Sequence, residues 1–305
     1  MSEQAAGTTY SVRAIVGFCV GLLVLPGLPA LWLGLQGLRE INASDGRIRG
    51  RFFAVGALVL GSAGVVLSLA GLLALILFPI RAASDRVRCQ NHLRQLGFML
   101  NLYYEKEKAY PRATLPQKPL PFEQRLSWYL YLLPLSGQEA LYERFDRSVG
   151  WDTEVNRRAA STQVPWFQCP ACMEMAPAGS PALTQYVGMA GVGGDAPLLP
   201  ADNRCAGVFG YDRRTKREEI TGGISYTMMV LETAAENGPW AAGGPSTLRS
   251  VDPARQPYVG PGRPFGGLHR GGLNILFVDG AVPFYSDTVD PQVFERLAVI
   301  GRDKP

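Results

Sequence analysis

The sequence predicts an α+β protein with two transmembrane helices, the second of which continues into a long helix packed on a sheet. The N-terminal quarter contains two uncharged apolar runs, residues 14–38 and 52–80, and each exceeds the roughly 20 residues that a helix needs to cross a bilayer core. After residue 110 glycine and proline are frequent, which is typical of short strands and long loops. We therefore expect a two-helix membrane anchor over residues 1–80 and an extracytoplasmic domain over residues 81–305.

Arginines beside the apolar runs indicate the orientation in the membrane. The loop between the runs is rich in arginine, whereas the N-terminal tail carries only Arg13, so the positive-inside rule places the loop in the cytoplasm. Four arginines after the second run oppose this orientation: Arg81, Arg86, Arg88 and Arg94. We expect a protein of the cytoplasmic membrane with a periplasmic C-terminal domain. The net charge of only +4 gives no indication of a nucleic-acid partner.

The second apolar run is expected to continue as an amphipathic helix. Apolar residues recur at spacings of 4, 3, 4 and 3, which places one stripe on a helix: Cys89, Leu93, Leu96, Leu100 and Tyr103. Pro79 marks a kink, and the helix ends before Pro111. One helix is therefore predicted over residues 52–108, and a sheet is expected to bury its stripe.

The rest of the chain predicts strands and loops more than helices. Residues 127–145 are expected to form a helical stretch broken by Pro134. Strands are predicted over residues 185–190 and 224–231, and residues 236–264 are expected to form a long surface loop.

A hairpin and a closing helix are expected at the C-terminus. The strands, residues 273–278 and 281–285, flank Asp279-Gly280, which favours a type I′ turn, and Pro283 makes the second strand an edge. Asp290-Pro291 is a typical helix start. The closing helix is expected to bury four apolar residues: Val293, Phe294, Leu297 and Ile300.

A series of short phrases follows the second apolar run. The first is Arg88-Cys89-Gln90-Asn91-His92-Leu93-Arg94-Gln95-Leu96-Gly97. The phrases that follow in order are Ser127-Trp128, Leu133-Pro134, Leu141-Tyr142, Phe145, Trp151-Asp152, Asn156, Cys169-Pro170, Tyr186-Val187-Gly188 with Gly191, Thr227 to Glu232, and His269 with Asp279-Gly280. This ordered set resembles a large pilin-like family of planctomycete-type bacteria, known as domain of unknown function 1559, and its first phrase resembles the family's helix after the membrane.

The resemblance covers roughly residues 80–305 and implies a pilin-like fold, in which a long helix packs on an antiparallel sheet. It implies no established activity. Typical members begin with a Gly, an aromatic or apolar residue and a Glu at the fifth mature position. Here Gly50-Arg51-Phe52-Phe53 precedes the second run and no Glu follows within that run, which argues against processing by a prepilin peptidase. The two-helix region resembles a separate small membrane module.

His269 and Asp279 suggest a metal or acid–base pair, but ten residues of extended strand cover roughly 33 Å, so the pair meets only if the chain folds back at Gly271-Gly272. A regular hairpin instead places His269 across from Asp290. We expect a contact between His269 and Asp290 at the base of the hairpin. The structural motif residues are His269, Asp279, Gly280, Asp290 and Glu232.

Cys169 and Cys172 have the spacing of a redox pair or of half a zinc site. The prolines and glycine of residues 177–181 exclude the helix that a thioredoxin-like site requires. Zinc would need two further ligands, for which Cys89 and Cys205 are the spare thiols. A disulfide is the simpler interpretation in an oxidising compartment. We expect Cys169 or Cys172 to pair with Cys205, and Cys89 to be a packed thiol.

Other candidate sites are weaker. Residues 193–212 contain four oxygen-bearing side chains that could bind Ca²⁺, but they match no EF-hand and are ordinary loop residues: Asp195, Asp202, Asn203 and Asp212. No positioned nucleophile accompanies the histidines, so we expect no enzyme, metal or cofactor.

The favoured hypothesis is a membrane-anchored, non-enzymatic pilin-like envelope protein with a structural or assembly role. Its expected partners are the lipid bilayer and other pilin-like or envelope proteins. The alternative is an anchored extracytoplasmic binding module for a small solute or glycan. Tyr186, Trp240 and Tyr258 are its exposed aromatic candidates, although buried packing explains each of them equally well.

Overall fold

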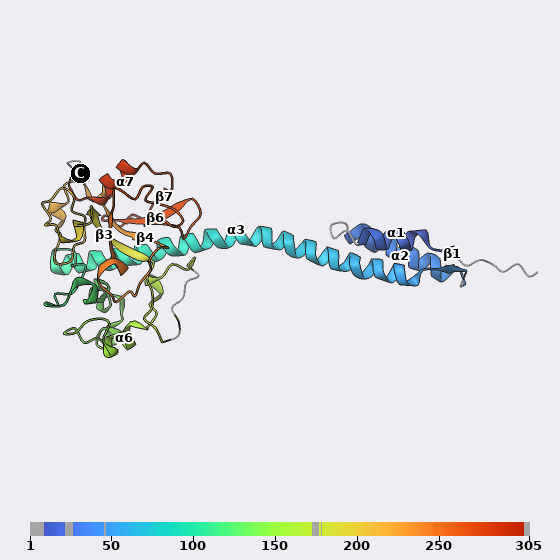
Figure 1. The fold of residues 1–305 in the computed structure, drawn as a ribbon, viewed down its shortest axis with the longest axis horizontal. Coiled ribbons are helices and arrows are strands. Elements are labelled where there is room, and N and C mark those ends of the chain that lie inside the picture. The colour runs from blue at the N-terminus through green and yellow to red at the C-terminus, as the bar shows by residue number, and fades with distance from the viewer. Residues whose placement is uncertain (1–8, 22–26, 46, 173–176, 178, 302–305) are drawn as a thin grey trace, which may run out of the picture. The chain divides into compact units, whose positions relative to one another are not determined.

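The computed structural model describes residues 9–21, 27–45, 47–172, 177 and 179–301, and divides the chain into two compact units, Met1–Arg81 and Ala82–Pro305 (Figure 1). The long helix α3 (Arg51–Glu107) begins in the first unit and ends in the second. These bounds confirm the predicted single helix to within one residue at each end. The helix continues through position 79.

In the first unit, the first apolar run folds back on itself instead of forming one span. It contains α1 (Val12–Gly21) and α2 (Gly27–Ala43). A Cβ atom added at Gly37 would lie 3.0 Å from the Cβ of Ala14, whereas one straight helix would separate these residues by roughly 35 Å. Pro29 lies in the first turn of α2, where a missing N–H is tolerated, so the sequence favours a helix start there.

Two short strands close the first unit at one end. β1 (Thr9–Tyr10) pairs in parallel with β2 (Ile48–Arg49). The segment before α1 and the segment after α2 therefore lie side by side. Small residues allow α2 and α3 to pack closely, as in membrane helix pairs. A Cβ atom added at Gly27 would lie 2.6 Å from the carbonyl oxygen of Gly61.

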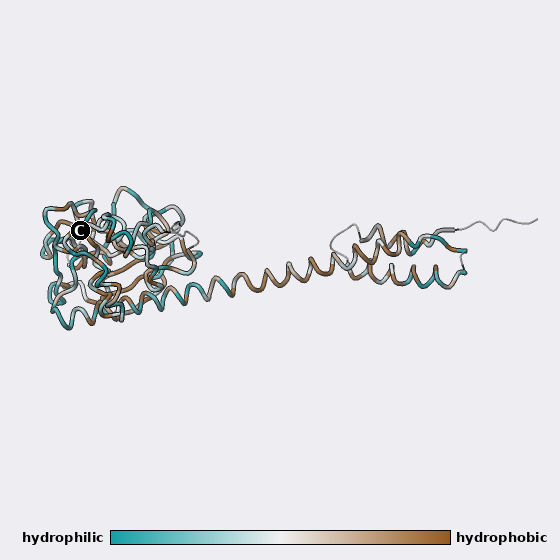
Figure 2. The backbone as a smooth tube through the Cα atoms, turned by 90° about the horizontal axis from the view of Figure 1, so that it is seen from below, coloured by the Kyte–Doolittle hydropathy of each residue, from teal (hydrophilic) through white to brown (hydrophobic). Residues whose placement is uncertain are grey.

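Among the described residues, α3 is the one helix long and apolar enough to cross a membrane, so only the second of the two predicted transmembrane helices has a candidate span. Figure 2 shows the apolar stretch of this helix in brown. Side chains of this stretch are exposed on every side of the helix, including Leu69, Leu72, Leu73, Leu75, Ile76, Leu77 and Phe78.

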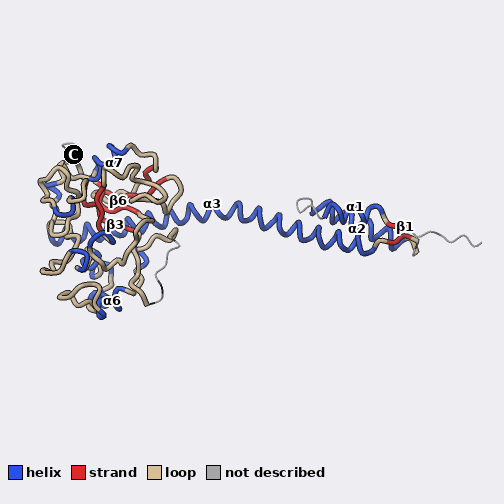
Figure 3. Tube along the Cα trace, in the orientation of Figure 1, coloured by secondary structure: helices blue, strands red, loops and turns tan. Residues whose placement is uncertain are grey.

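The second unit is built on a five-stranded sheet within the described residues, with strand order β5-β3-β4-β6-β7. Figure 3 shows strands in red, with β3 and β6 of this sheet labelled. The strands are β3 (Tyr186–Val192), β4 (Met228–Glu232), β5 (Leu248–Val251), β6 (Gly272–Phe277) and β7 (Phe284–Ser286). The sheet is mixed, which corrects the antiparallel expectation, because β5 runs parallel to β3. β4 runs antiparallel to β3. The chain then reverses again before it forms β5 on the other side of β3, and β5 is therefore parallel to β3.

The sheet separates two hydrophobic cores. One core contains the buried stripe of α3 together with Val230 and Leu276, and the other contains Leu231 and Ile275 with residues of α7 (Pro291–Ala298). Neighbouring residues of one strand face opposite sides of a sheet, so α3 and α7 cover opposite faces. The expected burial of the helix stripe by a sheet is confirmed.

Two glycines of the family-like phrases are explained by close packing. A Cβ atom added at Gly97 would lie 2.7 Å from the Leu276 side chain, so this glycine brings α3 close to β6. Gly191 has a φ of +120°, and a Cβ atom there would lie 2.0 Å from the carbonyl oxygen of Cys205. Only glycine fits this position without movement of the backbone.

Short helices cover the remainder of the α3 face. They are α4 (Tyr129–Leu132), α5 (Glu139–Tyr142) and α6 (Glu154–Ala160), with 3₁₀ turns at Phe122–Gln124, Pro134–Ser136, Pro165–Phe167, Ala196–Leu198, Arg217–Glu219, Ile224–Tyr226 and Gly244–Ser246. The predicted strand over 224–231 therefore begins only at Met228. The expected surface loop over 236–264 is wrong, because it contains β5 and the buried side chains of Trp240 and Tyr258.

The C-terminal hairpin and helix are largely as expected. β7 is an edge strand, and Asp290 caps α7 by accepting hydrogen bonds from the Gln292 and Val293 amides. The turn is not type I′. That type requires positive φ at both Asp279 and Gly280, and only Gly280 has it. The Phe277 amide donates to the Ala281 carbonyl, so the loop between the strands has three residues. α7 and the residues after it bury Phe294, Leu297 and Ile300, but Val293 is exposed.

Candidate functional site

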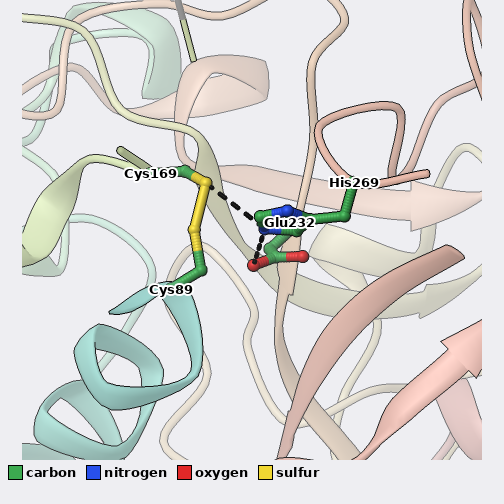
Figure 4. A group of neighbouring side chains, drawn as sticks. All are labelled: Cys89, Cys169, Glu232 and His269. Atoms are coloured by element: carbon green, nitrogen blue, oxygen red, sulfur yellow. Dashed lines mark hydrogen bonds and ion pairs between the residues drawn. A yellow bond between two sulfur atoms is a disulfide. The ribbon is translucent and has the colours of Figure 1, made fainter. Parts of the chain in front are cut away.

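The second unit brings four chemically capable side chains to one buried point (Figure 4). We call them the buried Cys–Glu–His cluster: Cys89, Cys169, Glu232 and His269. Their sulfur, carboxylate and imidazole atoms all lie within 4.8 Å of one another. The residues come from α3, the segment before β3, the end of β4 and the turn before β6, so the fold assembles the cluster from distant parts of the sequence.

Cys89 reaches the cluster because it opens the buried stripe of α3. Cys89, Leu93, Leu96 and Leu100 have no exposed surface, as the spacing predicted. The stripe then continues through Tyr104, since Tyr103 is only half-buried. Cys169 is fixed on the opposite side by its backbone amide, which donates to Oε1 of Gln185 at 3.0 Å.

Glu232 carries the buried carboxylate of the cluster. It is the last residue of β4 and faces the same side of the sheet as Val230, toward α3. Both oxygens accept hydrogen bonds from Asn274, one from the backbone amide at 2.7 Å and one from Nδ2 at 2.8 Å. A carboxylate with no exposed surface requires such partners, because its desolvation is otherwise costly.

His269 completes the cluster through a turn of the chain. It forms an isolated bridge with Gly272, and Gly271 between them has a φ of +81°, which reverses the chain. Nε2 of His269 lies 3.4 Å from Oε1 of Glu232 and 3.5 Å from Sγ of Cys169. The expected contact between His269 and Asp290 is therefore wrong: the chain turns before the hairpin base, and Asp290 caps α7.

The cysteines pair differently from the expectation. Cys89 and Cys169 form a disulfide across a sequence separation of 80 residues, with Cα atoms 5.3 Å apart. The predicted bond between Cys169 or Cys172 and Cys205 is not formed, and Cys205 is a half-buried thiol in another loop. The buried stripe of α3 makes this pairing, because it presents Cys89, which we expected to be a packed thiol, to the segment that ends at Cys169.

The other sequence-predicted residues have structural contacts. Asp279 accepts a hydrogen bond from the Ala281 amide at 2.9 Å within the hairpin turn that Gly280 completes. In the candidate calcium loop, Asp212 pairs with Arg125 at 3.1 Å, and Asn203 accepts from the Cys205 amide. Among the residues whose positions are described, the buried Cys–Glu–His cluster is the one group of this kind, so the calcium loop forms no comparable site.

The aromatic residues proposed for a binding surface are buried. Tyr186 and Trp240 have no exposed surface, and Tyr258 has almost none. Burial, and next the negative charge of Glu232, raise the pKa of the Tyr186 phenol well above its ordinary value. Tyr186 is thus a neutral neighbour of the cluster. These three residues do not form the exposed surface expected of a binding module.

A pocket of about 320 Å³ reaches the Cys169 side of the cluster. It is lined by His92, Gln163, Pro165, Gln168, Cys169, Pro170, Cys172 and Gln185. Nδ1 of His92 lies 2.9 Å from the carbonyl oxygen of Gln168. The pocket brings solvent near the disulfide segment, while the four cluster side chains themselves remain at most 9% exposed.

The fold and the cluster define a class of protein: a three-layer α+β domain that follows an apolar helix and is stapled to that helix by a disulfide. The chain belongs to the protein family of unknown function DUF1559, whose family model matches residues 79–250, more than half of the chain. The matched residues include Cys89, Cys169 and Glu232, whereas His269 and Asp279-Gly280 lie beyond them. No curated protein and no solved structure matches the chain.

Proposed function

We propose that this protein is a membrane-anchored, non-enzymatic, pilin-like envelope protein with a structural or assembly role. The observation that carries the proposal is the helix α3. Its first half contains an apolar stretch that is almost entirely exposed, and its second half is buried on one face against the sheet of the second unit. A single helix with these two halves is suited to hold a folded domain at a membrane.

The uncovered apolar surface supports anchoring. A core helix of a soluble protein buries most of its apolar side chains, but Leu75 and Phe78 are 74% and 78% exposed. Each large apolar side chain left in water costs about 1.5–3 kcal/mol relative to burial, so more than ten of them in one stretch require a covering medium. A lipid bilayer satisfies this requirement along the exposed apolar stretch of the helix.

The first unit supports one crossing of the bilayer. The α1–α2 pair begins and ends beside the β1–β2 strands, so α3 alone carries the chain across. The arginine-rich segment before α3, with Arg47, Arg49 and Arg51, favours the cytoplasmic side. The second unit then lies in the periplasm, where a disulfide is stable.

The chemistry of the buried Cys–Glu–His cluster supports a non-enzymatic role. The two cysteines are joined and the carboxylate is held by Asn274 on both oxygens, so these groups brace the fold. Catalysis requires such groups to reach a substrate, whereas these side chains are enclosed.

An exposed apolar surface on α3 supports assembly with a second copy. Phe98 and Leu102 lie beyond the apolar half of the helix yet are 65% and 38% exposed. Phe98 also lines a pocket of about 420 Å³ with Leu135 and Trp166. Exposed apolar surface of this kind marks interaction sites, and in an assembling protein a second copy would cover it.

Two measurements on the full chain in bacterial membranes test the proposal. Extraction with alkaline carbonate leaves an anchored chain in the membrane pellet, and release into the supernatant would contradict anchoring. A photo-crosslinking residue at Phe98 is expected to give adducts with a second copy. Leu198, which is 64% exposed on a different segment, is the matched control and is expected to give none. Absence of adducts at both positions would exclude assembly through this face.

A further inference from the structure

We propose that the reduced form of the buried Cys–Glu–His cluster is a binding site for one Zn²⁺ ion, and that the metal and the disulfide exclude each other. The donors are the two sulfurs, one carboxylate oxygen and one imidazole nitrogen. Cysteine sulfur, histidine nitrogen and glutamate oxygen are all ligands that Zn²⁺ uses in proteins, and four of them are usually arranged at the corners of a tetrahedron.

The distances in the cluster already match such a tetrahedron along two edges. Zinc–ligand bonds of about 2.0–2.3 Å give ligand separations of roughly 3.3–3.8 Å. Nε2 of His269 lies 3.4 Å from Oε1 of Glu232 and 3.5 Å from Sγ of Cys169. After reduction the two sulfurs would move apart to this range, and the remaining donor pairs, which lie within 4.8 Å of one another, would adjust by roughly 1 Å or less. The backbone of the disulfide-bonded fold already places the four side chains around one point.

The surroundings favour a cation once the disulfide opens. Two thiolates and the Glu232 carboxylate would place three negative charges in a buried space, and Zn²⁺ would offset two of them. Asn274 holds the carboxylate by two hydrogen bonds, which is the support that metal-binding carboxylates usually have. Neutral His269 would supply the fourth donor without adding charge.

The redox step balances with an external dithiol as reductant. The dithiol transfers two electrons and two protons to the disulfide between Cys89 and Cys169 and closes to its own disulfide. Zn²⁺ then displaces the two thiol protons, which pass to solvent. A disulfide-containing oxidant restores the bond between the two sulfurs by accepting two electrons and two protons from the metal-free dithiol, and is itself reduced to two thiols.

The test uses the full chain in detergent micelles, with Co²⁺ as a spectroscopic probe and Zn²⁺ as competitor. The chain reduced by dithiothreitol, with the excess then removed under nitrogen, is expected to take up one Co²⁺. Visible bands of a tetrahedral site and thiolate charge-transfer bands would report this uptake, and Zn²⁺ would remove them. The oxidised chain is expected to show neither. Equal cobalt spectra for the oxidised and reduced chains would overturn the proposal.

Matched variants locate the site. His269→Ala and Cys169→Ser are expected to abolish the tetrahedral spectrum, whereas His92→Ala and Cys205→Ser are expected to leave it unchanged. Asn274→Ala is expected to weaken affinity about 10–100-fold by releasing the carboxylate. Wild-type binding in both cluster variants would refute the assignment.

A second measurement tests the case in which the reduced chain loses its structure in the absence of metal. The chain is also reduced with Zn²⁺ already present, and its near-ultraviolet circular dichroism is recorded. Zinc is expected to preserve the folded spectrum and to raise the unfolding midpoint of the reduced chain. A reduced chain that unfolds equally with and without Zn²⁺ would overturn the proposal.

Discussion

Replacing both members of the Cys89–Cys169 disulfide with alanine is expected to lower the free energy of unfolding by about 4.5 kcal/mol. The bond closes a loop across a sequence separation of 80 residues. In the chain-entropy treatment, opening a loop of this length returns about 15 cal/mol/K to the unfolded state, which is about 4.5 kcal/mol at 25 °C. Domains are typically stable by 5–15 kcal/mol, so this loss is a large part of the total.

The assay is urea unfolding of the full chain in a mild detergent, followed by tryptophan fluorescence. Trp128 and Trp240 have no exposed surface in the second unit, so their emission reports its unfolding. Cys205→Ala is the matched control, and its free energy of unfolding is expected to stay within about 0.5 kcal/mol of the wild type. The wild type with its disulfide reduced should resemble the double variant in metal-free buffer. An unfolding free energy of the double variant within 1 kcal/mol of the wild type would refute the reasoning.

Three further outcomes are expected in the same assay. Gly191→Ala is expected to lower the free energy of unfolding by about 3 kcal/mol or more, because of the positive φ and a backbone clash. Gly194→Ala, which has open space around it, should lower it by under about 1 kcal/mol, and equal effects would contradict this account. Glu232→Gln is expected to cost about 1–3 kcal/mol, because its amide group would face the Asn274 donors, while the exposed Glu236→Gln should be nearly neutral. Burial raises the pKa of the Tyr129 phenol above its ordinary value near 10. The stability that comes from keeping this phenol neutral is complete below pH 10, and above pH 10 it falls by up to about 1.4 kcal/mol per pH unit. Tyr129→Phe should remove this part of the dependence of the unfolding free energy on pH. An unchanged pH dependence in the variant would contradict the prediction.

The sequence predicts best those elements whose signals are local. The spacing of Cys89, Leu93, Leu96 and Leu100 predicts the buried face of α3, and Asp290-Pro291 predicts the start of α7, because helix periodicity and capping depend on neighbouring residues. The break in the first apolar run was harder to predict. Length and hydropathy favour one span, whereas contacts such as Gly37 against Ala14 favour two helices, and these contacts have no local signature.

The candidate site was predictable only in part, because it depends on tertiary contacts. Cys169, Glu232 and His269 could be singled out from family-like phrases, but the sequence did not show that they meet. The cysteine pairing was wrong because Cys89 satisfies two descriptions equally well, a packed thiol on an apolar stripe and one half of a disulfide. The type I′ turn failed for a related reason: Asp-Gly also suits a three-residue loop, and the register of β6 against β7 decides between them.

The position of the cluster suits the disulfide to a mechanical role in addition to its effect on stability. Cys89 lies nine residues after Ile80, the last residue of the apolar run, and is the first fully buried residue that follows it on α3. The bond to Cys169 therefore joins the folded domain to its helix close to where the proposed membrane segment ends. A force on the domain would reach α3 through this covalent bond, as well as through the packed stripe. Without the disulfide, the helix end nearest the proposed membrane segment would be held to the domain by packing alone, because the chain itself enters the rest of the domain only after Glu107, at the other end of α3.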